Sequence, residues 1–89
     1  MRTVTICTQT FCPYCIQLKM LFKRWGVPYN EINMSERPDD ELKALRDETS
    51  FYTLPQVFAG DDFLGGYDNI LSLYQSGKLF KLLGMEENV

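Results

Sequence analysis

The chain has 89 residues, 45% of them hydrophobic and 13% aromatic, which is enough for a single domain with a small core. Its formal net charge of −3 and isoelectric point near 4.8 argue against nucleic acid or an anionic membrane as the main partner. No apolar run approaches the roughly 20 residues that span a bilayer. The apolar stretch at the start of the chain is too short for a signal peptide. We therefore expect one domain over residues 1–89, monomeric and cytoplasmic.

The chain contains three cysteines, Cys7, Cys12 and Cys15, and no histidine. A secreted disulfide scaffold of this size usually carries more cysteines, in pairs. In a reducing compartment, two closely spaced cysteines more often serve catalysis or metal binding than structure. The lack of histidine removes the commonest metal ligand and the commonest general base.

The first half of the chain predicts a strand, a helix and a second strand. Thr3–Thr8 alternates and is rich in β-branched residues, which is typical of a strand. Pro13 opens a helix that runs to about Trp25 and is ended by Gly26. Tyr29–Ile32 is a short second strand. The helix presents an apolar stripe at helical spacing, formed by Leu18, Leu21, Phe22 and Trp25.

A second helix is expected to begin at Pro38, because acidic residues fill the turn that follows it. Its inward-facing residues are Leu42 and Leu45. Gln56–Ala59 and Phe63–Leu64 form a β-hairpin around Gly60-Asp61-Asp62. A third helix carries an apolar face at i, i+3, i+4 and i+7, and Leu79–Leu83 forms a short amphipathic tail ended by Gly84. That face comprises Tyr67, Ile70, Leu71 and Tyr74.

The predicted order is β-α-β-α-β-β-α. A strand, helix, strand start favours parallel pairing through a right-handed crossover, and the later hairpin adds an antiparallel edge. The chain is therefore expected to be an α/β protein with a thioredoxin-like fold, in which a four-stranded mixed sheet is flanked by helices.

The strongest chemical signal is Cys12-Pro13-Tyr14-Cys15, which lies where a strand ends and a helix begins. Proline suits the first helical position, because its missing N–H would have no partner there. Cys12 is then the N-cap residue, and its sulfur is expected to accept hydrogen bonds from the N–H groups of Tyr14 and Cys15.

The amides and the helix dipole both favour a thiolate at this place. Cysteines at helix N-termini have pKa values lowered to about 3.5–7.5, against about 8.5 when free. Lys19 adds a cation one turn beyond Cys15, on roughly the same helix face. We expect Cys12 to be the exposed attacking sulfur and Cys15, turned toward the domain, to resolve a mixed disulfide.

A structural zinc site and a redox role for Cys7 are the other interpretations of the cysteines. A structural zinc site is disfavoured, because Cys7 is the single further sulfur ligand and histidine is absent. Cys7 alternates with Ile6 inside the first strand, so we interpret it as a small core or near-site residue rather than a redox residue.

Three motifs together give the chain a resemblance to glutaredoxins over essentially its whole length. They are Cys12-Pro13-Tyr14-Cys15, then Thr53-Leu54-Pro55-Gln56-Val57-Phe58, then Gly65-Gly66-Tyr67-Asp68-Asn69, in family order and spacing. The resemblance implies a cis proline at Pro55, facing the active-site cysteines, which leaves the Leu54 backbone free to pair with a peptide-like substrate.

The resemblance also implies a glutathione site. Gly65-Gly66 turn the backbone into the third helix, which Asp68 or Asn69 can cap, and the start of that helix holds the γ-glutamyl carboxylate. Tyr14 flanks the tripeptide. The expected glutathione contacts are Gln9, Tyr14, Thr53, Leu54, Pro55, Gly66, Tyr67, Asp68 and Asn69.

The sequence departs from the family pattern at two of these positions. Glutaredoxins usually carry a lysine where this chain has Gln9, meeting the glycine carboxylate, and an aspartate where it has Asn69, contacting the γ-glutamyl amine. Both ionic contacts become neutral ones. Leu54 replaces the commoner valine, which is a mild change.

By resemblance, the function is glutathione-dependent reduction of protein disulfides and glutathione mixed disulfides by the Cys12/Cys15 dithiol. Glutathione is a co-substrate, no metal is expected, and ribonucleotide reductase is one family-level candidate for the electron acceptor. Two alternatives stay open: a dithiol redoxin recharged by thioredoxin reductase, and glutathione-ligated iron–sulfur cluster binding. Pro13 speaks against the cluster, because family members that hold clusters generally lack proline there.

Overall fold

The computed structural model describes residues 1–85, and within them no helix is long and apolar enough to cross a membrane. Predicted strand boundaries differ from the observed ones by one residue at most, and the predicted order is confirmed, with two short helices, η1 and α4, added. In chain order the elements are β1 (Val4–Thr8), α1 (Pro13–Trp25), β2 (Asn30–Asn33), the 3-10 helix η1 (Met34–Glu36), α2 (Asp39–Thr49), β3 (Gln56–Ala59), β4 (Asp62–Gly65), α3 (Tyr67–Gln75) and α4 (Leu79–Leu82).

The sheet has four strands in the order β2-β1-β3-β4. β1 pairs with β2 in parallel and with β3 antiparallel, and β3 and β4 form the antiparallel hairpin. The mixed sheet and its thioredoxin-like arrangement are therefore as predicted. A parallel pair requires a crossover connection, and α1 supplies it.

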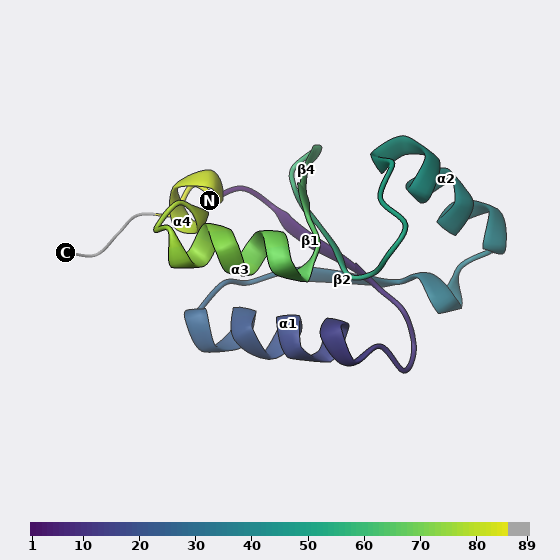
Figure 1. Cartoon of the computed structure of the whole chain (residues 1–89), viewed down its shortest axis with the longest axis horizontal. Helices are drawn as coiled ribbons and strands as arrows, with labels where there is room; N and C mark the ends of the chain where they lie inside the picture. Colours follow the sequence, from purple (N-terminus) through teal and green to yellow (C-terminus); the bar gives the residue numbers. More distant parts are fainter. Residues whose placement is uncertain (86–89) are drawn as a thin grey trace.

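Successive residues of β1 and β3 point to opposite faces of the sheet, and each face has its own core. Ile6 and Val57 lie in the larger core, which α1, α3 and α4 cover. Cys7 and Phe58, one residue further along each strand, belong to the smaller core under α2. Figure 1 shows α1 and α2 on opposite sides of the strands. The larger core comprises Val4, Ile6, Leu18, Phe22, Val27, Val57, Ala59, Ile70, Leu79 and Leu83.

The smaller core includes the cysteine pair. Cys12 and Cys15 pack there with Cys7, Met34 and Leu54. Leu42 and Leu45 of α2 face this cluster as expected, but they are half-buried, and α2 has no fully buried residue. The redox motif is therefore supported by a thin layer of apolar side chains.

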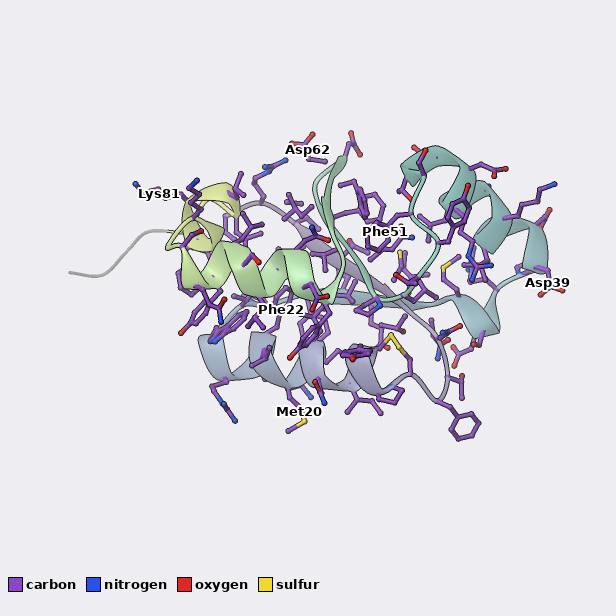
Figure 2. The ribbon with its side chains drawn as sticks, viewed as in Figure 1. Met20, Phe22, Asp39, Phe51, Asp62 and Lys81 are labelled. Atoms are coloured by element: carbon purple, nitrogen blue, oxygen red, sulfur yellow. A yellow bond between two sulfur atoms is a disulfide. The ribbon has the colours of Figure 1, made fainter. Side chains whose placement is uncertain are left out.

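The far end of α1 is fixed by a glycine and by aromatic packing. Gly26 adopts the left-handed conformation (φ 72°) that the predicted helix stop requires. Trp25 stacks on Tyr74 of α3 with ring centroids 4.0 Å apart, and Phe22 packs beside Trp25 at 6.0 Å. In Figure 2, Phe22 lies between α1 and α3. These contacts hold the two helices that flank the cysteine site in a fixed relation.

Candidate active site

Cys12 caps the N-terminus of α1, as the sequence predicts. Its backbone is extended (φ −108°, ψ 101°), Pro13 follows at the first helical position, and the Cys15 N–H donates to Cys12 Sγ over 3.2 Å. The expected second donor, the Tyr14 N–H, makes no such bond, so that detail is wrong. An N-cap side chain accepts from the second or the third helical residue, and here it meets the third.

Cys12 and Cys15 form a disulfide with their Cα atoms 5.2 Å apart, so the structure represents the oxidised protein. The prediction that Cys12 is exposed is wrong for this state, because Cys12 is 5% and Cys15 1% exposed. Cys12 Sγ is bonded to the buried Cys15 and lies 3.6 Å from the Leu54 carbonyl oxygen. Cys15 is turned into the domain as expected.

Lys19, expected to support the cysteines with its charge, is paired with a carboxylate of β2. Its Nζ forms an ion pair with Glu31 over 3.0 Å, and Thr8 Oγ1 donates to the same carboxylate over 2.6 Å. The hydrogen bond from Thr8, followed by Lys19, holds the pKa of Glu31 below its usual value. The β1–β2 register pairs Ile6 with Glu31, which places this carboxylate on the face that α1 covers. The Lys19 charge is therefore largely balanced by Glu31.

A cleft of about 490 Å³ opens beside the cysteine pair, between the start of α1, the Pro55 loop and the start of α3. Its volume lies within the range of small-ligand sites. The lining includes every predicted glutathione contact except Gln9 and Gly66, and it adds Phe51, which the sequence analysis missed. The lining residues are Tyr14, Phe51, Thr53, Leu54, Pro55, Tyr67, Asp68 and Asn69.

The floor of the cleft depends on two glycines that precede α3. A Cβ on Gly66 would lie 2.9 Å from the Phe51 ring and 3.2 Å from the Pro55 carbonyl oxygen. Gly65 has φ +113°, and a Cβ there would lie 2.5 Å from Asn69. Gly66 is thus not a lining residue but the N-cap that lets α3 approach the Pro55 loop.

Asn69 is already engaged by the backbone. Its Oδ1 accepts from the Gly66 N–H over 3.0 Å, so Asn69 caps α3 from the third helical position. Because Gly66 has no side chain, this is one half of a capping box. The Asn69 Nδ2 group and the N–H groups of the first turn of α3 remain as donors on this side of the cleft.

The Leu54–Pro55 peptide is cis, as the resemblance implies. The loop before it is fastened by Gln56, which is fully buried. Gln56 Nε2 donates to the Phe51 carbonyl over 2.6 Å and to the Thr53 carbonyl over 3.3 Å, while Thr49 Oγ1 donates to Gln56 Oε1 over 3.1 Å. This role of Gln56 was not predicted, although a polar residue in a strand expected to be buried is a signal for one.

The cleft is aromatic and carries little charge. The rings of Tyr14 and Tyr67 lie 5.3 Å apart across it, and Phe51 packs on Phe63 at 5.4 Å. Among its described lining residues, Asp68 is the one that is charged. Gln9, expected near a carboxylate, is exposed and does not line the cleft. The site can hold a peptide-like ligand that presents a carboxylate to α3 and an amine to Asp68.

Cys7 lies behind the cysteine pair. It is 5% exposed and packs in the same core as Cys12 and Cys15, and burial raises the pKa of its thiol. A second cavity of about 400 Å³ under α2 has Cys7 in its wall. A protonated, enclosed thiol is a poor nucleophile. In residues 1–85 no group of three or more acidic, cysteine or histidine side chains could hold a metal ion.

A thioredoxin-like sheet, a CxxC pair at a helix N-terminus and a facing cis-proline loop together define a thiol–disulfide oxidoreductase with a redox-active dithiol. Comparisons with known proteins agree. A model of the family described as glutaredoxin matches residues 4–64. A glutaredoxin of Pseudomonas aeruginosa is 40% identical over 84 residues, covering 93% of this chain and 98% of that protein.

Solved structures give the same result. The crystal structure of a buckwheat glutaredoxin–glutathione complex superposes with a TM-score of 0.85 at 30% identity, over 93% of this chain and 77% of the other. The solution structure of a glutaredoxin from Brucella melitensis gives 0.84 at 34% identity, over 100% and 96%. The chain belongs to the glutaredoxin family, and its activity is that of a glutaredoxin-type disulfide oxidoreductase.

The Gln56 contacts predict a stability effect with a functional consequence. Gln56→Met keeps the length of the side chain but removes its hydrogen bonds, and buried groups left unpaired cost about 1–3 kcal/mol each. We expect the free energy of unfolding to fall by about 2–4 kcal/mol and the KM for a glutathionylated peptide to rise. Gln75→Met, at an exposed position of α3, is the matched control. Equal unfolding curves for the two variants would contradict the role given to Gln56.

Cys7 is predicted to serve packing. Cys7→Ala should leave the reduction rate within about twofold and lower the free energy of unfolding by about 1 kcal/mol, because it removes one buried atom. Chemical denaturation and a disulfide-reduction assay measure the two quantities. A large loss of activity in a normally folded variant would instead place Cys7 in the redox cycle.

Proposed function

We propose that the protein reduces protein disulfides and glutathione mixed disulfides with glutathione as the electron donor. The observation that carries the proposal is the cleft of about 490 Å³ that opens onto the start of α3 and is lined by Leu54, whose carbonyl oxygen lies 3.6 Å from Cys12 Sγ. The buckwheat relative is a complex with glutathione, which supports the same ligand here. Glutathione keeps thiols reduced in the cytoplasm, and we propose that compartment for this cycle.

The cycle begins from the reduced protein. The Cys12 thiolate, which faces the Cys15 N–H at the start of α1, attacks one sulfur of the substrate disulfide. A mixed disulfide forms, and the other substrate sulfur leaves and takes a proton. For a protein disulfide, Cys15 then attacks Cys12 Sγ, releasing the second substrate thiol and closing the Cys12–Cys15 disulfide. Two electrons have passed from the dithiol to the substrate.

Glutathione restores the dithiol in two steps. One glutathione thiolate attacks Cys12 Sγ, freeing Cys15 and leaving Cys12 glutathionylated. A second glutathione then attacks the glutathione sulfur, releasing oxidised glutathione and the Cys12 thiolate. When the substrate is a glutathionylated protein, the Cys12 thiolate attacks the glutathione sulfur and the protein thiol leaves. The glutathionylated Cys12 is then reduced by glutathione as above, so this route needs Cys12 alone.

We propose the following position for each end of the tripeptide in the cleft. The N–H groups of the first turn of α3 donate to the γ-glutamyl carboxylate, Asp68 pairs with the γ-glutamyl amine, and Tyr14 and Tyr67 flank the chain. The glycine carboxylate extends toward solvent, where Gln9 offers a neutral contact. This arrangement makes the γ-glutamyl end the main determinant of binding.

The reductant is tested by supplying one electron source at a time. With a glutathionylated peptide as substrate, we expect turnover with glutathione and little with thioredoxin reductase alone. Turnover with thioredoxin reductase alone would favour the redoxin alternative, which the neutral Gln9 and Asn69 leave open. A coloured, freshly purified protein with visible absorbance would instead indicate an iron–sulfur cluster.

The two cysteines are predicted to behave differently in two assays. Cys12→Ser should abolish reduction of every disulfide, because it removes the attacking thiolate. Cys15→Ser should keep activity on glutathione mixed disulfides but lose most reduction of intramolecular protein disulfides. If Cys15→Ser loses activity equally in both assays, the division of roles is wrong.

The neutral residues at the glutathione site predict a gain of binding on restoring charge. Exposed ion pairs contribute about 0.2–1 kcal/mol each, so Gln9→Lys with Asn69→Asp should tighten glutathione binding about three- to tenfold. Aspartate at position 69 can still accept the Gly66 N–H, which protects the α3 cap. The gain should shrink at high salt because the contacts are exposed.

The measurement is the glutathione concentration at half-maximal turnover, for wild type and double variant, in low and in high salt. An unchanged value at low salt would mean that Gln9 and Asn69 do not face the ligand as the resemblance implies.

A further inference from the structure

The residue directly before the nucleophile is an aromatic ring in solvent. Phe11 is 96% exposed and has φ +58°, a left-handed conformation that bulky residues seldom adopt. Unfavourable backbone conformations that persist next to a reacting group often serve a function. Within the described chain, Phe11 packs in neither hydrophobic core, so its ring has no structural role there.

Two further apolar side chains, on α1 itself, are exposed. Ile16 is 53% and Met20 58% exposed, and their i, i+4 spacing places them on one helix face. Figure 2 shows Met20 extending from the side of α1 that faces away from the sheet. We call Phe11, Ile16 and Met20 the α1 ridge. It begins beside Cys12 and runs toward the C-terminal end of the helix.

The charge around the α1 ridge differs from that of the rest of the chain. α1 carries Lys19, Lys23 and Arg24 and no acidic residue. The whole chain has 9 basic and 12 acidic residues, so the remainder has 6 basic and 12 acidic residues and a net charge of −6. Glu31 balances Lys19, while no ion pair involves Lys23 or Arg24 among residues 1–85. The apolar α1 ridge is thus followed along the helix by two basic residues, Lys23 and Arg24, while the rest of the protein carries a net negative charge.

We propose that the α1 ridge is the docking surface for substrate proteins whose reacting disulfide is flanked by an apolar side chain and by acidic residues. Phe11 and Ile16 receive the apolar residue beside the reacting cysteine, and Arg24, with Lys23, attracts the acidic residues further along. A second copy of this chain fits poorly, because two α1 faces would bring like charges together.

The redox step is the one already balanced: the Cys12/Cys15 dithiol gives two electrons to the docked disulfide, whose sulfurs leave as thiols. The inference goes beyond the proposed function, because it concerns the protein substrate and not the reductant. It is therefore tested in a single turnover, with pre-reduced protein and no glutathione, so that a failure of the glutathione proposal leaves this test unaffected.

The probes are two short disulfide-looped peptides that differ in charge. In one, the reacting cysteine is followed by leucine and two aspartates; in the other, lysines replace the aspartates. We expect the acidic peptide to be reduced at least about threefold faster at low salt, with the preference lost at high salt. Equal rates for the two peptides at low salt would overturn the charge part of the proposal.

Three variants test the ridge itself. Arg24→Glu should reverse or abolish the preference for the acidic peptide. Met20→Ser and Phe11→Asn should slow both peptides severalfold while leaving reduction of the small hydroxyethyl disulfide unchanged. Asparagine tolerates the left-handed backbone at position 11, and the unchanged small-substrate rate reports an intact Cys12 site.

The matched controls lie on α4, which Figure 1 shows on the other side of α3 from α1 and away from the start of α1. Leu82→Ser and Lys81→Glu change an apolar and a basic residue there, both exposed, and should leave both peptide rates unchanged. Equal effects of the α4 and α1 variants would overturn the proposal. Binding of the wild-type protein, but not Met20→Ser, to anionic lipid vesicles with no peptide preference would assign the ridge to a membrane instead.

Discussion

The structure is organised around one contact, the hydrogen bond from the Cys15 N–H to Cys12 Sγ at the start of α1. The sulfur occupies the place of an N-cap oxygen, so the unpaired amides of the first helical turn and the helix dipole act on it directly. Pro13 gives up no hydrogen bond at the first helical position, and β1 delivers the chain to this point from the centre of the sheet. The chemistry of the protein is therefore set by where a strand ends and a helix begins.

Two further elements, the Pro55 loop and the start of α3, shape the cleft beside this sulfur. The Pro55 loop brings the Leu54 carbonyl within 3.6 Å of Cys12 Sγ, and Gln56 fixes the loop from below. Gly66 allows α3 to approach the same loop so closely that any side chain would meet the Phe51 ring. The cleft is thus the space left between three backbone segments, and its walls are held by the fold and not by the ligand.

The sequence predicted most of this arrangement, because its key features are local. The N-cap position of Cys12, the helix stop at Gly26 and the hairpin after Pro55 each depend on a few neighbouring residues. The features that the sequence could not predict depend on how strands pair and on contacts between residues that are distant in the chain. Lys19 meets Glu31 because the parallel pairing of β1 and β2 places that carboxylate under α1. Cys12 is buried because Leu54, distant in sequence, packs against it.

The central claim is that the start of α1 keeps Cys12 as a thiolate in the reduced protein. Alkylation by iodoacetamide, followed across pH and assigned to each cysteine by mass spectrometry, tests it most directly, because only the thiolate reacts. The account predicts that Cys12 still reacts rapidly in mildly acidic solution, where free cysteine does not, while Cys7 stays unreactive. If the alkylation rate of Cys12 falls in parallel with that of free cysteine as the pH is lowered, the account is contradicted.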